Sequence, residues 1–572
     1  MPKIEVSDKK FFSYLGNEMT SDELERIFPK AKAELDGWDK DNGVLKIELN
    51  DTARPDLWSA EGLARTLNLA TGNKVKKQNY LSKKGEAKDS GNRLFVVDDD
   101  YPEYRQYSIG FAANGKVVDE DILTSLIQTQ EKICANYGRK RKLIAMGIYR
   151  SDKITYPVHY CSKNPDETSF VPLHENKSMT LREILKEVPK GQEYAALIEK
   201  EERFPFLEDD KGVPLSMPPV INSNDVGAVE IGDKNLFIEM SGPNLKMLLL
   251  ASNIVAADMQ DMGFKILPIK VKFPYKTEFG TSITVPYYFQ EKTTTTIKEA
   301  EDLLGIKLNA RDVKKYLSEM GIEATVDEKG KVSALPPSYR NDLISSVDII
   351  EDIAIARGLE SFDTESLSDF TIGRLTKAEY FARKVKPLLV GLGFQEMMYN
   401  YLSSVKEYAE NMHVSDEGMI HIMNPMSEKF ALVRPSIMPS LLKTESLSSH
   451  APYPHRAFEF GKVAYLDKDA PGGTVTYNHF ALMSANEGEN YNSISSLVAT
   501  LFYFLGIEYT LSELDDPRFI KGRCARVMLK GEEVGVFGEI HPQVLTSWSI
   551  EVPTVIAEFN ADKIIKSTGY AV

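Results

Sequence analysis

One segment near the middle of the chain, residues 340–358, constrains the fold more than any other, because its apolar and acidic side chains fall on different sides of one helix. At about 100° per residue, one narrow stripe is apolar. The stripe consists of Leu343, Val347, Ile350 and Ala354. Asp342 and Gly358 stand where a helix N-cap and C-cap would stand. The pattern therefore predicts an amphipathic helix between them.

The neighbouring face of this predicted helix carries Asp348, Glu351 and Asp352. Asp348 and Asp352 are like charges four residues apart, which costs a few tenths of a kcal/mol unless something compensates. A hard divalent cation with oxygen ligands, usually Mg²⁺, would compensate. An ordinary solvated acidic face explains the same pattern without a metal. From the pattern alone, both explanations stay open.

Length and composition set the class of protein. A chain of 572 residues is too long for one core and predicts about three to five domains. Its 42% apolar and 27% charged residues are typical of soluble globular proteins. We expect a cytoplasmic location without a membrane span, because there is no long apolar run and no apolar signal region. The scattered Cys134, Cys161 and Cys524 suit a reducing compartment and exclude a disulfide framework.

The net charge of −15 argues against a protein that holds nucleic acid by bulk electrostatics. Two local basic runs stand out, at residues 74–84 and at Arg139–Lys142. Solvated loops are the usual explanation for such runs, and phosphate contacts are the alternative.

Alternating strand-like and helix-like segments predict a multidomain α+β protein with four parts. The expected parts are residues 1–85, 86–275, 285–365 and 370–572. Within them we expect helices over 21–33, 122–137, 296–304, 309–321 and 377–392. We expect strands over 44–49, 107–113, 143–149, 236–240, 266–271, 525–529 and 533–539, and a hairpin over 323–334.

Short catalytic motifs are missing from the chain. It contains no G-x-x-x-x-G-K-[ST] phosphate loop, no G-x-G-x-x-G after a strand and no G-x-S-x-G elbow. Short motifs therefore do not identify a reaction.

Three longer segments, in a fixed order, carry a resemblance to a known family. They are RPDLWSAEGLAR at 54–65, PSYRNDLISSVDIIEDIAIARG at 337–358 and FEFGKV at 458–463. Together they resemble the beta subunit of phenylalanyl-tRNA synthetase, and the similarity runs over essentially the whole chain. The length, and the lack of an appended C-terminal anticodon-binding domain, resemble the archaeal and eukaryotic form rather than the longer bacterial one.

The resemblance implies a role for each expected part. Residues 1–85 would be an N-terminal α/β domain, and 86–275 an α+β tRNA-editing domain. Residues 285–365 would be a small winged-helix-like domain with one structural Mg²⁺, and 370–572 a class II synthetase-like antiparallel-sheet domain without catalytic activity. The implied partner is a catalytic alpha subunit, in an assembly of two alpha and two beta chains, which uses ATP and phenylalanine to charge tRNA(Phe).

The metal pattern of the family matches four carboxylates in the acidic segment. They are Asp342, Asp348, Glu351 and Asp352. This agreement favours a bound ion over a merely solvated face, and some of the four would ligate it only through water.

No residue of the last domain is expected to catalyse synthesis. Class II catalysis needs an arginine, one residue and then an acid, whereas Arg456 and Glu459 are separated by two residues. The glycine-rich string Gly391–Glu396 stands at the wrong end of the domain and closes with an acid. We expect Asn424–Ser427 and the Arg434-Pro435 pair to serve the fold and subunit contacts instead.

The editing site implied by archaeal relatives maps onto four positions. They are Leu207, Ser216, Glu239 and Ser241. Glu239 replaces an Asp and Ser241 replaces a Thr, and the extra methylene would shift a hydrogen bond by about 1 Å. A strand end before the Gly242-Pro243 turn would explain Glu239 and Ser241 without an active site. Asn222 and Ser223 are further candidates for the lining of the pocket.

The resulting hypothesis is a beta subunit that supports ATP-dependent charging of tRNA(Phe) by the alpha subunit and hydrolyses mischarged tyrosyl-tRNA(Phe). In this hypothesis Ser216 and Ser241 place the ester, and Glu239 binds the tyrosine hydroxyl or the tRNA terminus. The alternative is a free-standing module that binds tRNA or protein without a synthetase partner. A self-sufficient ligase is disfavoured by the missing motifs.

Overall fold

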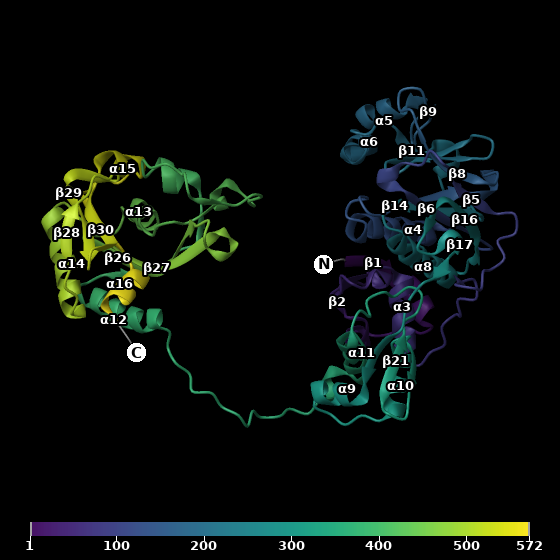
Figure 1. Cartoon of the computed structure of the whole chain (residues 1–572), viewed down its shortest axis with the longest axis horizontal. Helices are drawn as coiled ribbons and strands as arrows, with labels where there is room; N and C mark the ends of the chain where they lie inside the picture. The colour runs from purple at the N-terminus through teal and green to yellow at the C-terminus, as the bar shows by residue number, and fades with distance from the viewer. Residues whose placement is uncertain (1–2, 570–572) are drawn as a thin grey trace. The chain divides into compact units, whose positions relative to one another are not determined.

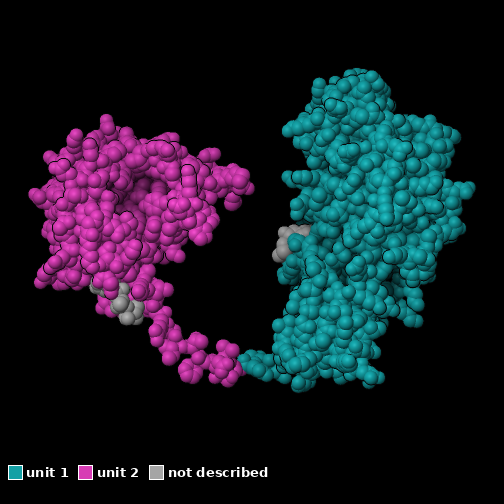
Figure 2. Space-filling model, in the orientation of Figure 1, with its two compact units in different colours: residues 1–365 teal, residues 366–572 magenta. Residues whose placement is uncertain are grey.

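Residues 3–569 are described by a computed structural model, in which the chain divides after Glu365 into two units (Figure 2). Residues 363–376, at this division, contain no helix and no strand. Each unit has several sheets and helices of its own, so the protein is a multidomain α+β protein as expected (Figure 1). None of the helices described is long and apolar enough to cross a membrane.

The first part of unit 1 is a three-stranded antiparallel sheet with helices beside it. Its strands are, in spatial order, β1 (Lys3–Ser7), β3 (Val44–Leu49) and β2 (Ala33–Asp39). The helices are α1 (Asp8–Leu15), α2 (Ser21–Ile27) and α3 (Ala60–Ala70). The expected helix over 21–33 is too long, because Pro29 stands in a short 3₁₀ turn, Phe28–Ala31, and β2 begins at Ala33.

The next part of unit 1 contains two larger sheets. One has the order β13 (Ile221–Asn222), β12 (Pro214–Met217), β11 (Phe204–Asp209), β8 (Val158–Lys163), β5 (Leu94–Val97), β16 (Ile269–Thr277) and β17 (Gly280–Val285). The other has the order β15 (Lys265–Leu267), β6 (Tyr107–Asn114), β14 (Leu236–Gly242) and β7 (Ala145–Arg150). The single strand expected over 266–271 is wrong: Pro268 separates β15 from β16, and the two belong to different sheets.

This part of unit 1 also contains two long helices. Helix α8 (Leu245–Met262) is buried along most of its length and carries Asp258, which accepts hydrogen bonds from Ser59 (2.7 Å) and Arg65 (2.9 Å) at the start of α3. Helix α4 (Glu120–Lys132) is shorter than the helix expected over 122–137, because its last turn, Ile133–Tyr137, widens to a π-helix.

A left-handed turn comes after the π-helical segment. Arg139, Lys140 and Arg141 have φ angles of 49°, 53° and 64°. Each such residue costs about 1–2 kcal/mol relative to an ordinary conformation. The backbone N–H groups of Lys140 and Arg141 donate to Ala135 and Cys134, both at 2.9 Å, and hold this conformation.

The small part at the end of unit 1 has the expected helix pair and hairpin. Helices α9 (Ile297–Leu304) and α10 (Ala310–Glu319) precede the hairpin strands β20 (Glu323–Val326) and β21 (Lys331–Leu335), and β19 (Thr293–Thr296) pairs with the other side of β21. The acidic helix α11 (Ser346–Arg357) closes the unit. The prediction that Asp342 is its N-cap is wrong. Ser345 is the N-cap and forms a capping box with Asp348.

The predicted apolar stripe of α11 is also partly wrong. Val347 is 53% exposed, whereas Ile349 and Ile353 are fully buried. The helix packs against both α10 and β19, so its buried surface is wider than one stripe. The stripe was predicted for a helix that begins after Asp342, whereas Asp342 pairs with Arg340 and the helix begins at Ser346.

Unit 2 is built on one seven-stranded sheet. Its order is β22 (Gln395–Glu396), β26 (His455–Leu466), β27 (Thr474–Ala485), β31 (Thr554–Asn560), β30 (Glu532–Ile540), β29 (Phe519–Leu529) and β28 (Thr510–Glu513). All neighbours are antiparallel except β22 and β26. Helices α12 (Lys377–Gly391), α14 (Tyr491–Leu505) and α16 (Ala561–Thr568) share one hydrophobic core with the sheet. Helices α13 (Met438–Leu447) and α15 (Pro542–Ser547) share another.

Candidate functional site

A cavity of about 710 Å³ in unit 1 is the principal candidate for a functional site. Helix α4, strands β7 and β12 and the chain from Pro218 to Asn222 contribute to its lining. Two of the four predicted editing residues, Ser216 and Glu239, line it, and so does Asn222. Leu207, Ser223 and Ser241 do not.

Glu239 lies on β14, which pairs with β6 on one side and with β7 on the other. Its side chain is buried, and the Ser108 hydroxyl donates to its Oε1 at 2.7 Å. Burial raises the pKa of Glu239 to about 7, against the opposing effects of the Ser108 hydroxyl and the Arg105 guanidinium. No salt bridge reaches this carboxylate from any residue in the range 3–569. Burial therefore favours the protonated form of this acid far more than it would be favoured in an exposed glutamate.

Glycines flank Glu239 on both neighbouring strands. Gly110 of β6 and Gly147 of β7 are its register partners. A Cβ at Gly147 would collide with the hydroxyl end of Tyr149. Gly147 thus lets the Tyr149 side chain fold over the strand and reach the cavity. Isolated glycines inside strand patterns signal such close approaches, so the sequence carried a sign of this site that was missed.

Tyr149 supports Ser216 across the cavity. Its buried hydroxyl donates to the Ser216 Oγ at 2.8 Å, and burial raises the pKa of Tyr149, which keeps this donor protonated. Leu207 stands opposite Ser216 in the pairing of β11 with β12 and is fully buried. Leu207 therefore supports the strand that carries Ser216 and is not part of the cavity lining.

Ser241 lies on β14, two residues after Glu239, and is also fully buried. The guanidinium of Arg105 donates from Nε to the Ser241 Oγ at 3.2 Å and also to the Ser241 carbonyl. The prediction that Ser241 places an ester directly is therefore not what the geometry supports. Its hydroxyl holds Arg105 instead, behind the acid that the cavity presents.

The four predicted metal ligands do not share one coordination sphere. Arg340 pairs with both Asp342 (2.5 Å) and Asp352 (2.8 Å), and both acids are largely buried. The Arg340 guanidinium holds the pKa of Asp342 below its usual range despite this burial, whereas the deeper burial of Asp352 raises its pKa.

The outer two carboxylates face other partners. Asp348 accepts backbone hydrogen bonds from Ile344 (2.8 Å) and Ser345 (2.6 Å), and Glu351 pairs with Lys32 at 3.0 Å while remaining half exposed. As arranged here, arginine and lysine compensate three of the four charges. Asp348 and Glu351 are the two carboxylates of the group that Arg340 does not pair with.

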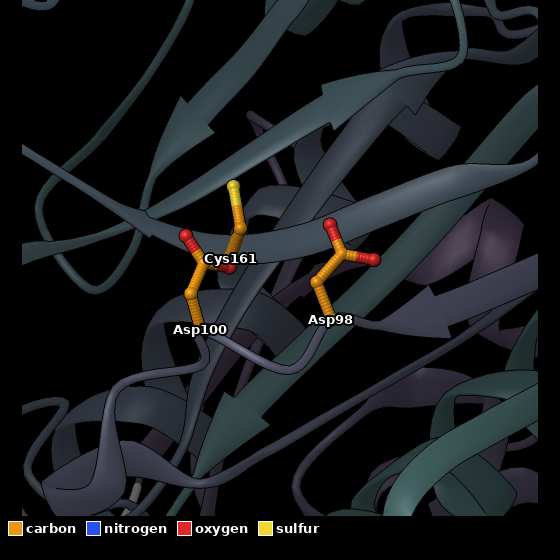
Figure 3. A group of neighbouring side chains, drawn as sticks. All are labelled: Asp98, Asp100 and Cys161. Atoms are coloured by element: carbon orange, nitrogen blue, oxygen red, sulfur yellow. The ribbon is translucent and has the colours of Figure 1, made fainter.

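Asp98, Asp100 and Cys161 form a different group of close ligand atoms (Figure 3). Within residues 3–569, this is the one set of three His, Cys, Asp or Glu side chains whose ligand atoms lie within 4.8 Å of one another. Burial raises the pKa of the Cys161 thiol, which disfavours the thiolate that a metal needs. Asp98 already contacts His159 at 2.9 Å and Asp100 contacts Arg203 at 3.2 Å. We assign no metal to this group.

Unit 2 has a cavity of about 490 Å³ on one face of its sheet, and Figure 2 shows this unit hollowed. The buried Glu558 lines it and accepts hydrogen bonds from the Ser436 hydroxyl (2.6 Å), two backbone N–H groups and His479 Nδ1 (2.8 Å). These contacts hold the pKa of Glu558 below its usual range. Four hydrogen bonds from the surrounding fold thus hold this carboxylate in place.

The two residues considered for synthesis are engaged in the fold. Glu459 forms a buried bidentate pair with Arg434, both bonds being 2.8 Å. Arg456 donates to the Ser484 hydroxyl at 3.3 Å and to the Leu392 carbonyl at 3.2 Å. Arg434 thus serves the fold as predicted, while Asn424 and Met426 are exposed.

Two family descriptions match consecutive parts of the chain. The "Phenylalanyl tRNA synthetase beta chain CLM domain" matches residues 364–561, and the "tRNA synthetase B5 domain" matches residues 293–359.

Relatives of known name match the chain over nearly its whole length. The phenylalanine–tRNA ligase beta subunit of Borrelia hermsii (strain HS1 / DAH) is 42% identical over 565 residues, covering 99% of this chain and 100% of that protein. The subunit of the same name from Borreliella burgdorferi (strain ZS7) is 41% identical over 568 residues, with the same coverage. These full-length relatives are bacterial, so the predicted archaeal or eukaryotic type is not supported.

A solved structure of a related fragment is also similar to this chain. It is an N-terminal fragment of the phenylalanyl-tRNA synthetase beta subunit from Pyrococcus horikoshii, 34% identical, with a TM-score of 0.58. The match covers 62% of this chain and 100% of the fragment.

Proposed function

Because this chain belongs to the family of phenylalanine–tRNA ligase beta subunits, we propose that it acts with a catalytic alpha subunit and hydrolyses mischarged tyrosyl-tRNA(Phe) in the cavity of unit 1. The observation that carries the second part is Glu239, a buried acid with a pKa of about 7 and no salt bridge to any described residue, which faces that cavity.

A proofreading site answers a physical need of the synthetic reaction. A pocket that binds phenylalanine cannot strongly reject an isostere with one added hydroxyl, and discrimination of about 10² is what binding alone gives. A second site that forms a hydrogen bond with the hydroxyl of tyrosine binds tyrosine in preference to phenylalanine. Phenylalanine in that site leaves the buried acceptor unpaired, which costs far more than a lost contact.

The roles follow from the lining of the cavity. Glu239 accepts the hydrogen bond from the tyrosine hydroxyl, and Ser216, oriented by Tyr149, positions the ester. A water attacks the ester carbonyl carbon, the bond to the ribose oxygen breaks, and that oxygen takes up a proton. Substrate hydroxyls and backbone groups position the water, and no side chain of the chain serves as general base. Ser241 and Arg105 hold the strand beneath Glu239.

The test is hydrolysis of tyrosyl-tRNA(Phe) by the purified holoenzyme. We expect the wild type to hydrolyse it, and Glu239→Gln to be slower by about 10²-fold with phenylalanine charging unchanged. Glu199→Gln, an exposed position outside the cavity lining, is the matched control. A wild-type holoenzyme that leaves tyrosyl-tRNA intact would exclude the editing role.

The dependence on an alpha subunit is tested by phenylalanine-dependent exchange of pyrophosphate into ATP. We expect no exchange from this chain alone and full exchange from an assembly of two alpha and two beta chains. Engagement of Glu459 and Arg456 within the fold supports this expectation. Exchange by the chain alone would mean a self-sufficient ligase, and failure to bind any alpha subunit would favour the free-standing module.

A single magnesium ion on the exposed side of α11 is a further part of the proposal. Asp348 and Glu351 would hold it with several waters, and Asp342 and Asp352 would act only through Arg340. We expect Mg²⁺ to raise the unfolding temperature of the wild-type holoenzyme modestly and not that of Asp348→Asn. Equal temperatures with Mg²⁺ and with a chelator would exclude the ion.

A cytoplasmic location, which we propose as well, is consistent with a partner role in tRNA charging.

A further inference from the structure

The left-handed turn after α4 presents a run of cations beside the cavity of unit 1. Arg139, Lys140 and Lys142 are exposed, and Arg141 between them lines the cavity. Within the part of the chain that the structure describes, no carboxylate lies within 4.0 Å of a cationic nitrogen of these four residues. These four consecutive cations form a local positive surface in a protein of net charge −15.

The turn is fixed to the cavity and is not a free loop. Arg141 donates from Nη1 to the carbonyls of Pro219 (3.0 Å) and Val220 (2.8 Å), which also line the cavity. Its guanidinium stacks on Tyr194, 4.2 Å from the ring centroid. The positions of the neighbouring exposed cations are therefore set relative to the cavity.

Arg105 ties the same turn to the acid of the cavity. This buried guanidinium donates to the carbonyls of Arg141 (3.1 Å) and Lys142 (3.4 Å) as well as to the Ser241 Oγ (3.2 Å). Arg105 therefore holds the end of the turn, through one left-handed residue, Arg141, and through Lys142 after it. A conformation this costly persists only where its surroundings over-determine it, which is a common property of functional segments.

The other cation of the cavity lining is already paired, and so is one of its acids. Lys190 pairs with Glu193 at 2.9 Å, and Glu230 pairs with Arg150 at 2.6 Å. The unpaired positive charge at this site is therefore concentrated on residues 139–142.

We propose that residues 139–142 bind the phosphates of the single-stranded 3′ end of a mischarged tRNA and lead its ester into the cavity. This inference rests on the proposed editing function and adds the surface by which the nucleic acid is held. Contacts of this kind are electrostatic and independent of sequence, and they weaken with salt in proportion to the number of phosphates bound.

The test compares two esters in the holoenzyme: tyrosyl-tRNA(Phe), and tyrosyl-adenosine, which has the same ester and no phosphate. In the variant Arg139→Gln/Lys140→Gln/Lys142→Gln, we expect the KM for tyrosyl-tRNA to rise about tenfold or more. We expect its dependence on log salt concentration to fall by about 2, since each phosphate contact on a single strand accounts for about 0.7. The kcat, and all hydrolysis of tyrosyl-adenosine, should be unchanged.

The control removes the same number of charges elsewhere in the same part of unit 1, with Lys200→Gln/Lys211→Gln/Lys234→Gln, three exposed positions outside the cavity lining. An equal rise in KM in this control would overturn the inference, because net charge would then explain it. The inference would also be overturned if the variant Arg139→Gln/Lys140→Gln/Lys142→Gln kept the KM and the salt dependence of the wild type. Wild type that hydrolyses neither ester overturns the editing function itself, and this inference with it.

Discussion

Glu239 in unit 1 and Glu558 in unit 2 are both buried glutamates that line a cavity, yet their surroundings differ in one respect. Glu558 accepts hydrogen bonds from a hydroxyl, from His479 and from the backbone N–H groups of Ile437 and Met438, which hold its pKa below the usual range. Burial raises the pKa of Glu239 to about 7, although the hydroxyls of Ser108 and Ser241 and the Arg105 guanidinium oppose it. The acid of unit 2 has four hydrogen-bond donors that outweigh its burial, whereas the partners of the acid in unit 1 do not, and we propose that a ligand completes them.

The number of hydrogen-bond donors that the fold supplies, and not the size of the cavity, distinguishes a structural carboxylate from one proposed to bind a ligand. A buried charge is tolerated where the fold supplies its partners, and it becomes costly where the fold does not. The cost at Glu239 is recovered only when a donor enters the cavity. A tyrosine hydroxyl is such a donor, and the side chain of phenylalanine has none.

The largest effect on stability is expected for a substitution of Glu558, and its absence would contradict the comparison of the two acids. Glu558→Gln removes the charge that four donors surround, and we expect unit 2 to lose about 3–5 kcal/mol, as when one partner of a buried pair is removed. Hydrogen exchange of β27 and β31 in the holoenzyme measures this loss. Because the pKa of Glu558 is lowered in the fold, its contribution is present above pH 4.5 and declines as the pH falls below it.

The matched control for Glu558→Gln is Glu551→Gln, an exposed glutamate of the same unit. Tyrosyl-tRNA hydrolysis per folded enzyme should be unchanged in both variants. If Glu558→Gln left hydrogen exchange unaltered but reduced hydrolysis, the structural role assigned to Glu558 would be wrong.

At Glu239 we expect the opposite effect of a Glu→Gln substitution on the free energy of unfolding, namely stabilisation. Its folded pKa of about 7 lies above the ordinary value of 4.5, so ionisation is penalised in the fold between these values. Glu239→Gln, which cannot ionise, should match the wild type at pH 4.5 and exceed it at pH 8 by up to about 3 kcal/mol. Hydrogen exchange of β6 and β14 at the two pH values gives the measurement. A variant that is less stable than the wild type at pH 8 would contradict the pKa assignment.

The same pKa should appear in the rate. An ionised carboxylate accepts a stronger hydrogen bond from a phenol than a protonated one. We therefore expect kcat/KM for tyrosyl-tRNA hydrolysis to rise about 10²-fold from pH 5 to pH 8, with its midpoint near pH 7. Glu239→Gln provides the reference for spontaneous hydrolysis and should lack this midpoint. A wild-type profile parallel to that of the variant would mean that Glu239 does not bind the substrate.

Local patterns in the sequence predicted the local elements well. The hairpin strands Glu323–Val326 and Lys331–Leu335 and the helix Lys377–Gly391 follow from periodicity and turn residues within a few positions. The split at Pro268 was also visible in the sequence but was given too little weight.

The surroundings of the sites could not be predicted in the same way. Ser108 and Glu239 are 131 residues apart, and their contact depends on the pairing of β6 with β14. Arg340 takes up Asp342 and Asp352 through a geometry that helical periodicity does not contain. The resemblance supplied Glu239 as a candidate, while its pKa and its partners come only from the assembled sheets.

The smallest expected effect concerns two buried tyrosine hydroxyls, one in each unit, which allow the two cavities to be compared directly. Tyr149 donates to Ser216 at 2.8 Å in the cavity of unit 1, and Tyr408 and Ser440 share a hydrogen bond of 2.6 Å in unit 2, where Tyr408 lines the other cavity. Tyr149→Phe and Tyr408→Phe each remove one buried hydroxyl and should each cost about 1 kcal/mol of stability.

Only Tyr149→Phe should affect proofreading, because only Ser216 faces the proposed ester. Loss of its orienting hydrogen bond should slow tyrosyl-tRNA hydrolysis by about tenfold, mainly in kcat, since a misplaced ester still binds. Phenylalanine charging measured on the same preparations controls for folding and assembly. Equal hydrolysis by the two variants would mean that Ser216 does not position the ester, and the chemistry of the site would then have to rest on Glu239 and the substrate alone.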